Sequence, residues 1–301
     1  MNVTPLSVQA HRYIAGRWRR GEIGDPTRDA IAYTLTTLCD SYGNRPVSQL
    51  GPKAIDAWLE SVRDRAPSTR RNYISRVRSF CRWLQGEGLI KRDPTLHVPP
   101  VRQPRKVPVT LTREQVGILH GALPDLRAEV VVAIMDGIGA RCIEMANLEV
   151  EDFDPRRRLI TLRGKFGNER TVTVPKATAR LIGRYLDTTG LVSGPLIRSK
   201  TDPTRGLAPA TFSHYLRDWM WAAGVKKRAH DGRSAHGLRR TCLSELMDAC
   251  GNIRVVQGVA GHANIETTAR SYLTSVTTAQ MRKAMDLREQ MPDPDEIGEA
   301  A

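Results

Sequence analysis

The chain has 301 residues, of which 40% are hydrophobic and 26% charged. A chain of this size and composition can form stable cores without disulfides or structural metals, and it has room for two domains. Lys and Arg number 46 against 32 Asp and Glu, which gives a formal net charge of +14. This surplus favours a polyanionic partner, above all nucleic acid, although an arginine-rich soluble enzyme is the ordinary alternative.

Cysteine usage and the absence of targeting signals bound the compartment. The five cysteines are odd in number and form no CxxC pair, so disulfides and a zinc ribbon are disfavoured and a reducing environment is favoured. The N-terminus lacks the apolar segment of a signal peptide, and no apolar run reaches the length of a membrane span. We therefore expect a cytoplasmic protein with no membrane partner, associated with the nucleoid if it binds DNA.

Three helices are predicted in the N-terminal part. Residues 1–15 are weakly patterned, and residues 16–24 have the composition of a basic turn. Asp25 followed by Pro26 is typical of a helix start, and apolar residues at helical spacing predict further helices over 48–63 and 69–85, the last capped by Ser68.

The helix over 69–85 carries a surface of one charge sign. A run of arginines on a helix is usually only a solvated face, but here no acidic residue interrupts it. We interpret it as a surface that contacts DNA phosphates. Its members are Arg70, Arg71, Arg76, Arg78 and Arg82.

A proline-rich segment divides the chain. Residues 93–108 contain five prolines, which cannot form a regular helix, together with several basic residues. We expect a stiff, basic linker that lets two domains close around a duplex. The predicted parts are a helical DNA-binding domain at 1–98, the linker at 99–110, a catalytic domain at 111–290 and a disordered acidic tail at 291–301.

The second part of the chain predicts helices and one small hairpin. Thr112 to Gln115 has the pattern of a capping box, and the apolar helix that follows ends at Gly137 and Gly139. Arg141 comes next, with Glu144 three residues later on the same face of a helix. Alternating residues predict strands over 158–162 and 170–174, whose loop displays Lys165, and helices follow over 176–187 and 210–221. The expected fold class is mainly α with a small β-sheet (α+β).

Residues 235–274 collect side chains that suit a phosphate. His236 and Arg239 have the i,i+3 spacing of one helix face. Gly251 and Gly261 indicate helix ends, which places His262 at a turn. Asn264 is then a good N-cap for a helix that carries Tyr272. Each of these residues alone is typical of an ordinary surface, so the interpretation depends on the whole set.

Taken in chain order, the set has a known counterpart. Arg141, Lys165 on a hairpin, His236-x-x-Arg239, Gly261-His262 and a C-terminal Tyr272 resemble the signature of the tyrosine recombinase family, which includes phage integrases and Xer-like proteins. The string GHANIETTARSY is the most specific part, and SxTxRNY to DP over residues 68–94 is similar to the family's core-binding module. Two supporting positions depart from the family: Ile138-Gly139-Ala140-Arg141 replaces the common Thr-Gly-hydrophobic-Arg, and Ala260 replaces the usual Leu before Gly-His.

The resemblance implies a mechanism without metal or cofactor. Tyr272 would attack a DNA phosphodiester to give a 3′-phosphotyrosyl bond, while Arg141 and Arg239 bind the non-bridging oxygens. Lys165 would protonate the leaving 5′ oxygen, His236 would assist proton transfer from the tyrosine, and His262 would hydrogen-bond the phosphate. Glu144 would orient a basic residue from behind. The resemblance also implies a SAM-like helical core-binding domain and a mixed α/β catalytic domain.

The family further implies an assembly. Its members act on double-stranded DNA core sites as homotetramers on two duplexes, and a helix at 277–290 would be exchanged between protomers. Host or phage accessory factors are possible partners. The sequence leaves open whether the protein integrates and excises DNA or carries out Xer-like resolution. It also leaves open two other functions, a catalytically silent DNA-binding accessory protein and a type IB topoisomerase.

Overall fold

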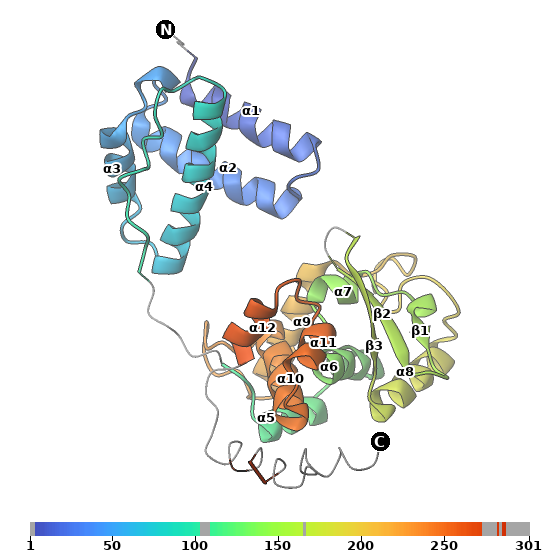
Figure 1. Ribbon diagram of the computed structural model, residues 1–301. Helices are drawn as coiled ribbons and strands as arrows, with labels where there is room; N and C mark the ends of the chain where they lie inside the picture. The colour runs from blue at the N-terminus through green and yellow to red at the C-terminus, as the bar shows by residue number, and fades with distance from the viewer. Residues whose placement is uncertain (1–3, 103–108, 165–166, 273–281, 283–284, 287–301) are drawn as a thin grey trace, which may run out of the picture. The chain divides into compact units, whose positions relative to one another are not determined.

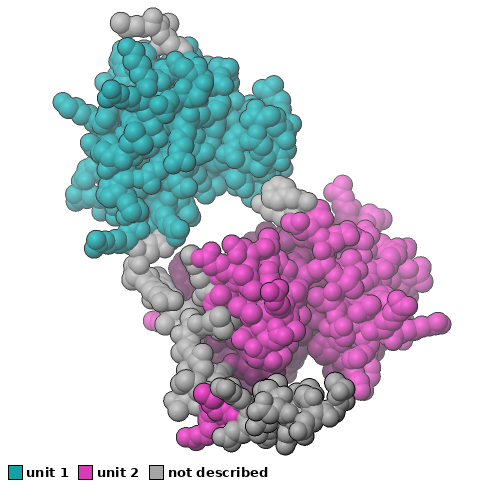
Figure 2. Space-filling view, in the orientation of Figure 1, with its two compact units in different colours: residues 1–106 teal, residues 107–301 magenta. Residues whose placement is uncertain are grey.

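The computed structural model describes residues 4–102, 109–164, 167–272, 282 and 285–286. The chain divides into two compact units, Met1–Lys106 and Val107–Ala301 (Figures 1 and 2). Val98 and Val101 pack with the core of unit 1, whereas Leu111 belongs to the core of unit 2. The first part of the predicted linker therefore lies against the first unit. The roles assigned to the two domains stay predictions at this point.

Unit 1 is helical. Its core is built from apolar side chains at helical spacing, among them the fully buried Trp58 and Phe80, and the indole N–H of Trp58 donates to Oγ1 of Thr37 (3.0 Å). The described elements are α1 (Leu6–Arg19), α2 (Asp25–Tyr42), the 3₁₀ turn η1 (Val47–Gln49), α3 (Pro52–Ser61) and α4 (Pro67–Gly86) (Figure 1).

Two expectations for unit 1 were wrong. Helix α1 occupies the weakly patterned N-terminal stretch, because Leu6, Ala10 and Tyr13 are spaced to bury one face against α2 and α4. Residues 16–19 of the predicted basic turn therefore end a helix rather than form a turn. Ser68 does not cap α4, since that helix begins at Pro67, and proline is favoured at the first helical position.

Unit 2 is mostly helical with a small antiparallel sheet in the order β1-β2-β3. The predicted fold class is confirmed. The described elements are α5 (Arg113–Gly121), α6 (Leu126–Ile138), α7 (Cys142–Ala146), η2 (Val150–Asp152), β1 (Phe153–Asp154), β2 (Leu159–Arg163), β3 (Glu169–Thr173), α8 (Lys176–Thr189), α9 (Pro209–Ala222), α10 (Ala235–Cys250), α11 (Ile253–Ala260) and α12 (Ile265–Tyr272).

Helix α6 is the centre of this unit. Its residues 130–135 are all buried, and it packs against both α8 and α10. Apolar residues on every side are typical of a helix enclosed by others. In Figure 1 the sheet stands beside the group formed by α10, α11 and α12, and β3 is the strand that contacts α11. The hairpin is thereby brought next to the C-terminal helices.

The predicted helix boundaries of unit 2 are largely confirmed. Thr112 forms the capping box with Gln115 at the start of α5. Gly139, Gly251 and Gly261 each end a helix in the left-handed conformation, with φ of 62°, 62° and 60°. Strand β1, only two residues long, was missed. Within the described residues, no helix combines the length and the apolar character that crossing a bilayer requires.

A buried ion pair shapes the loop that leads into α10. Nζ of Lys226 donates to Oδ1 of Asp231 (2.6 Å), and only 8% and 2% of the two side chains are exposed. Burial by itself would raise the pKa of Asp231, but hydrogen bonds from Lys226 and from backbone N–H groups outweigh it, and the pKa falls well below its usual range. Three residues later Ser234 caps α10 by accepting from the N–H of Gly237 (3.3 Å).

We predict that Asp231→Asn destabilises unit 2 by about 3–5 kcal/mol, because it leaves the ammonium of Lys226 buried without a counter-ion. The Asp231 carboxylate contributes stability above its unfolded pKa of about 4, and this contribution is lost as the pH falls further. Chemical denaturation at pH 7 and pH 3 measures both effects. Asp218→Asn, which removes an exposed ion pair with Arg217, is the control. Equal loss of stability in the two variants would contradict the prediction.

Candidate active site

Arg141 is presented by the turn between α6 and α7. Gly139 ends α6 with a positive φ, and Arg141 is the N-cap residue of α7. Its backbone N–H donates to Oε2 of Glu144 (2.7 Å) and its Nη1 donates to Oε1 (2.7 Å). The carboxylate is fully buried, whereas 34% of the Arg141 side chain remains exposed. Glu144 therefore holds the backbone and the head of Arg141 from behind and leaves part of the guanidinium open.

A second arginine reaches the same carboxylate. Arg170 on β3 donates from Nη2 to Oε2 of Glu144 (2.9 Å) and from Nη1 to Oε1, and its Nε donates to the carbonyl oxygen of Val259 (2.9 Å). Burial favours a raised pKa for Glu144, but the bonds from Arg170 and Arg141 outweigh it and lower the pKa. Glu144 is thus an ionised carboxylate between two guanidinium groups.

Sequence reasoning used Arg170 only as the start of a strand. A signal for it exists, because Arg170, Val172 and Val174 alternate along one face. Val172 and Val174 are buried. An arginine on the buried face of a strand needs a buried carboxylate, since an unpaired charge there is costly. The only obstacle was that the partner, Glu144, comes from a different element.

Arg239 lies on α10 and connects this helix with two other segments of the chain. It is only 2% exposed, its Nη1 donates to the carbonyl oxygen of Gly139, and its Nη2 donates to that of Ala260 (2.6 Å). The same Nη2 lies 3.3 Å from Nε2 of His262. Arg239 therefore connects the turn before Arg141 with the turn that carries His262.

His262 is held as a neutral ring. Its Nδ1 lies 2.9 Å from Oγ1 of Thr268, and the guanidinium of Arg239 faces its Nε2. Because Nε2 accepts, the hydrogen-bond network assigns the proton to Nδ1, which donates to Thr268. Burial, followed by the charges of Arg239, Arg141 and Arg170, lowers the pKa of His262 to about 4.

His236 lies on the first turn of α10, one turn before Arg239, and is exposed. Partial enclosure of its ring lowers the pKa of His236, and the charges of Arg240, Arg239 and Arg141 lower it further. Burial and the neighbouring positive charges therefore favour the neutral form of both histidines.

A hollow of about 510 Å³ has Arg141, Glu144, Arg170, Gly261 and His262 among its lining residues. Three predicted site residues, Arg141, Glu144 and His262, therefore line one hollow, and Arg239 reaches it through its contact with His262. Lys165 lies outside the described residues. Tyr272 is the last residue of α12, and its side chain lies outside them as well. Their roles stay predictions.

The arginines of α4 do not all face one way. Arg71, Arg78 and Arg82 line a hollow of about 460 Å³ together with the hydroxyl-bearing Ser75 and Ser79. Arg76 instead donates from Nη1 to Oγ1 of Thr34 on α2 (3.0 Å). Arg70, half-buried, is absent from the residues that line this hollow. Three of the five predicted DNA contacts thus form one cationic groove.

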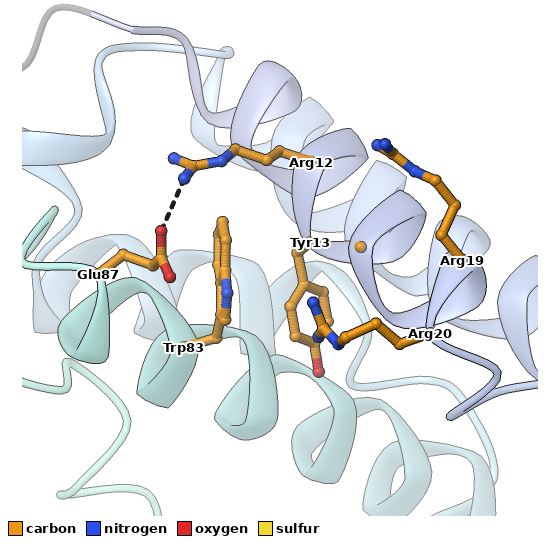
Figure 3. A pocket seen from close by; sticks show the side chains of 7 residues that line it. Arg12, Tyr13, Arg19, Arg20, Trp83 and Glu87 are labelled. Atoms are coloured by element: carbon orange, nitrogen blue, oxygen red, sulfur yellow. Dashed lines mark hydrogen bonds and ion pairs between the residues drawn. The ribbon is translucent and has the colours of Figure 1, made fainter.

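Helix α1 adds a second cationic surface to unit 1. Arg12 forms an ion pair with Glu87 (2.8 Å), and its guanidinium lies 5.6 Å from the ring centroid of Trp83 on α4. Figure 3 shows these side chains around a hollow that Arg19 and Arg20 also line. The positive charge of unit 1 is therefore not confined to α4.

Comparisons with known proteins agree with this geometry. The model of the phage integrase family matches residues 110–278. A tyrosine recombinase XerA of Thermococcus onnurineus is 30% identical over 287 residues, which cover 94% of this chain and 89% of the relative. The chain belongs to the phage integrase family. It is a tyrosine-type site-specific recombinase that cleaves and rejoins DNA strands.

Solved structures show the same fold. The recombinase resembles a lambda integrase dimer bound to a COC′ core site with a TM-score of 0.74 at 16% identity, over 90% of this chain and 78% of that one. It also resembles a lambda integrase tetramer bound to a Holliday junction with a TM-score of 0.72 at 17% identity, over 87% and 79% of the two chains.

We predict that the ring of His262 titrates near pH 4 and is neutral above it, as the lowered pKa requires. Nuclear magnetic resonance of the labelled imidazole measures this value. Arg239→Gln removes a positive charge that faces the ring, so the pKa of His262 should rise toward its usual value of about 6.5. A wild-type pKa near 6.5, or no rise in the variant, would contradict this account.

Proposed function

We propose that Arg141, Arg239 and His236 bind and activate a scissile DNA phosphate that Tyr272 attacks, and that His262 holds Arg239 in place. The observation that carries the proposal is that Arg141 and His262 line one hollow, with Glu144 buried behind Arg141 and Arg239 in contact with His262. Planar guanidinium groups match the geometry of phosphate oxygens and stay charged at every relevant pH. The site therefore suits an oxyanion that gains charge during a reaction.

In the proposed cleavage step, the phenolic oxygen of Tyr272 bonds to phosphorus and the bond from phosphorus to the 5′ oxygen breaks. The proton of the phenol passes to the neutral ring of His236, and Lys165 gives a proton to the leaving 5′ oxygen. The lowered pKa of His236 supports its role as acceptor. The 3′-phosphotyrosyl bond conserves the energy of the diester, so rejoining is the same step in reverse with a different 5′-hydroxyl.

Arg141 and Arg239 stabilise the pentacoordinate transition state in this proposal. Preorganised donors aimed at developing charge are worth about 3 kcal/mol or more each. His262 adds a ring held in place between Arg239 and Thr268. Glu144 orients Arg141 and does not touch the phosphate.

The groove of Arg71, Arg78 and Arg82 is the proposed contact of unit 1 with the backbone of a double-stranded core site. Its serine hydroxyls can donate to phosphate oxygens beside the guanidinium groups. Arg70 and Arg76, predicted as contacts from sequence, are not part of this groove, and Arg76 is engaged with Thr34.

We further propose a homotetramer on two duplexes as the active assembly. A lambda integrase tetramer bound to a Holliday junction has the same fold. The predicted C-terminal helix over 277–290 and the acidic tail over 291–301 fall largely outside the described residues. Accessory factors and a cytoplasmic, nucleoid-associated location complete the proposal. The silent accessory protein and the topoisomerase are not favoured.

The nucleophile is tested with a suicide duplex whose cleaved end diffuses away. The core site is first selected from random duplexes with the wild-type chain. We predict that wild type accumulates a covalent protein–DNA adduct joined through Tyr272, identified by peptide mass spectrometry. Tyr272→Phe should form no adduct while binding the duplex with unchanged affinity. Adduct formation by this variant would refute the assignment of the nucleophile.

The unit 1 groove predicts a specific salt dependence. Combined Arg71→Ala and Arg82→Ala should weaken binding to all sequences alike and reduce the slope of log affinity against log salt by about 2, because two phosphate contacts are lost. Fluorescence anisotropy at several salt concentrations measures the slope. Arg76→Ala removes the same charge from a residue bound to Thr34 and should leave the slope nearly unchanged. If the slope changed by the same amount per arginine in all variants, including Arg76→Ala, the contact would not be localised to the groove.

A further inference from the structure

We propose that Arg170 is a positioning residue for the cleavage reaction, which acts through Glu144 to set Arg141 and the turn that carries His262. This inference rests on the proposed function, because it assigns the means by which the phosphate-binding arginine is oriented. Arg170 is not one of the residues predicted from the sequence to take part in the chemistry.

The guanidinium of Arg170 is committed to protein partners. Its three nitrogens each donate to an acceptor, two of them to Glu144 and the third to the carbonyl oxygen of Val259. Only 13% of the side chain is exposed, against 34% for Arg141. The described bonds of Arg170 therefore hold Glu144 and the end of α11 in place, although the residue also lines the hollow.

These bonds join three separate elements at one point. Arg170 belongs to β3, Glu144 to the first turn of α7, and Val259 to the last turn of α11. Gly261, which follows α11, has to lie close to this guanidinium, since a Cβ there would fall 2.8 Å from Nη1 of Arg170. The positive φ favours glycine at this position, and any larger residue would displace the guanidinium of Arg170. The position of His262 thus depends on Arg170.

The charges explain why a second arginine is needed. Arg141 and Arg170 together carry two positive charges against one on Glu144, which leaves a surplus of one for the phosphate. Without Arg170, Arg141 is the only charged partner of the buried carboxylate among the described residues, and their charges cancel. Coulombic pairing in a buried site is screened little by water, so Arg141 is drawn toward the carboxylate and away from the substrate.

The decisive variant is Arg170→Lys, which keeps the charge but cannot form the bidentate pair and the bond to Val259 together. On a suicide core site we expect single-turnover cleavage about 100-fold slower than wild type, as misplacement of a catalytic group produces. Affinity for the duplex and the thermal unfolding midpoint should change little. Arg170→Gln, with no charge, should be slower still.

Two chemically modified duplexes distinguish a defect in the positioning of Arg141 from a general loss of active-site structure. A methylphosphonate at the scissile position lacks one charged oxygen and so needs less help from Arg141, and we expect it to recover at least 10-fold of the rate lost in Arg170→Lys. In a duplex with a 5′-bridging phosphorothiolate, the leaving group is a thiolate, which needs no proton from a general acid. This duplex should therefore restore cleavage by Lys165→Ala but not by Arg170→Lys. The double variant Arg141→Ala with Arg170→Lys should be slower than Arg141→Ala alone by much less than the 100-fold loss in Arg170→Lys, because only the effect on the turn of His262 remains.

Arg163→Lys is the matched control. Arg163 lies on the neighbouring strand β2 and forms ion pairs with Asp152 (2.6 Å) and Glu169 (3.1 Å), none of which contacts Arg141. Its substitution should give no defect that methylphosphonate corrects.

The outcomes are distinguishable. Cleavage by Arg170→Lys within threefold of wild type, or rescue by the phosphorothiolate alone, would overturn the role of Arg170 and leave the proposed function standing. A defect that follows the unfolding midpoint, or that adds fully to that of Arg141→Ala, would show a merely structural residue. A wild-type chain that forms no covalent adduct would overturn the proposed function and this inference with it.

Discussion

The arrangement of the site depends on one buried carboxylate. Glu144 has no exposed surface, and it accepts hydrogen bonds from the backbone and side chain of Arg141 and from both terminal nitrogens of Arg170. An ionised group in such a place is costly unless every lone pair has a partner. Because the partners come from α7 and β3, satisfying this one charge fixes the hairpin against the turn that presents Arg141. Arg239 makes the corresponding connection on the other side through the carbonyl oxygens of Gly139 and Ala260.

The helix ends are the second constraint. Carbonyl groups in the last turn of a helix have no partner within the helix, so they are open to side chains from elsewhere. Arg239 uses the carbonyl oxygens at the ends of α6 and α11, and Arg170 uses that of Val259 one residue earlier. Gly139 and Gly261 turn the chain sharply at these two ends, which brings Arg141 and His262 next to the same guanidinium. Glycines in the left-handed conformation and buried arginines therefore both bring the site residues close together.

The sequence predicted much of this arrangement, and the misses have physical reasons. Local signals sufficed for the capping box at Thr112 and for the glycine helix ends, since each depends on neighbouring residues. The order of Arg141, Arg239 and His262 indicated the family, but spacing could not show that Arg170 shares Glu144, because the pairing is long-range. Helix α1 was missed because its apolar stripe is short and its remaining residues are polar. The five arginines of α4 were treated as one surface, whereas packing against Thr34 removes Arg76 from it.

Electrostatics links the binding of phosphate to the protonation of the histidines. Arg141 and Arg239 are the groups that suit a phosphate, and their charges also lower the pKa of both His236 and His262. A histidine that accepts a proton from a tyrosine, as proposed for His236, has to be neutral when the substrate arrives, and burial together with the positive charge of the arginines favours this form. Once a phosphate occupies the hollow, its negative charge offsets that of the arginines and makes the imidazolium easier to form. In the proposed reaction, the same arginines would thus favour a neutral base in the empty site and allow it to take the proton when DNA is bound.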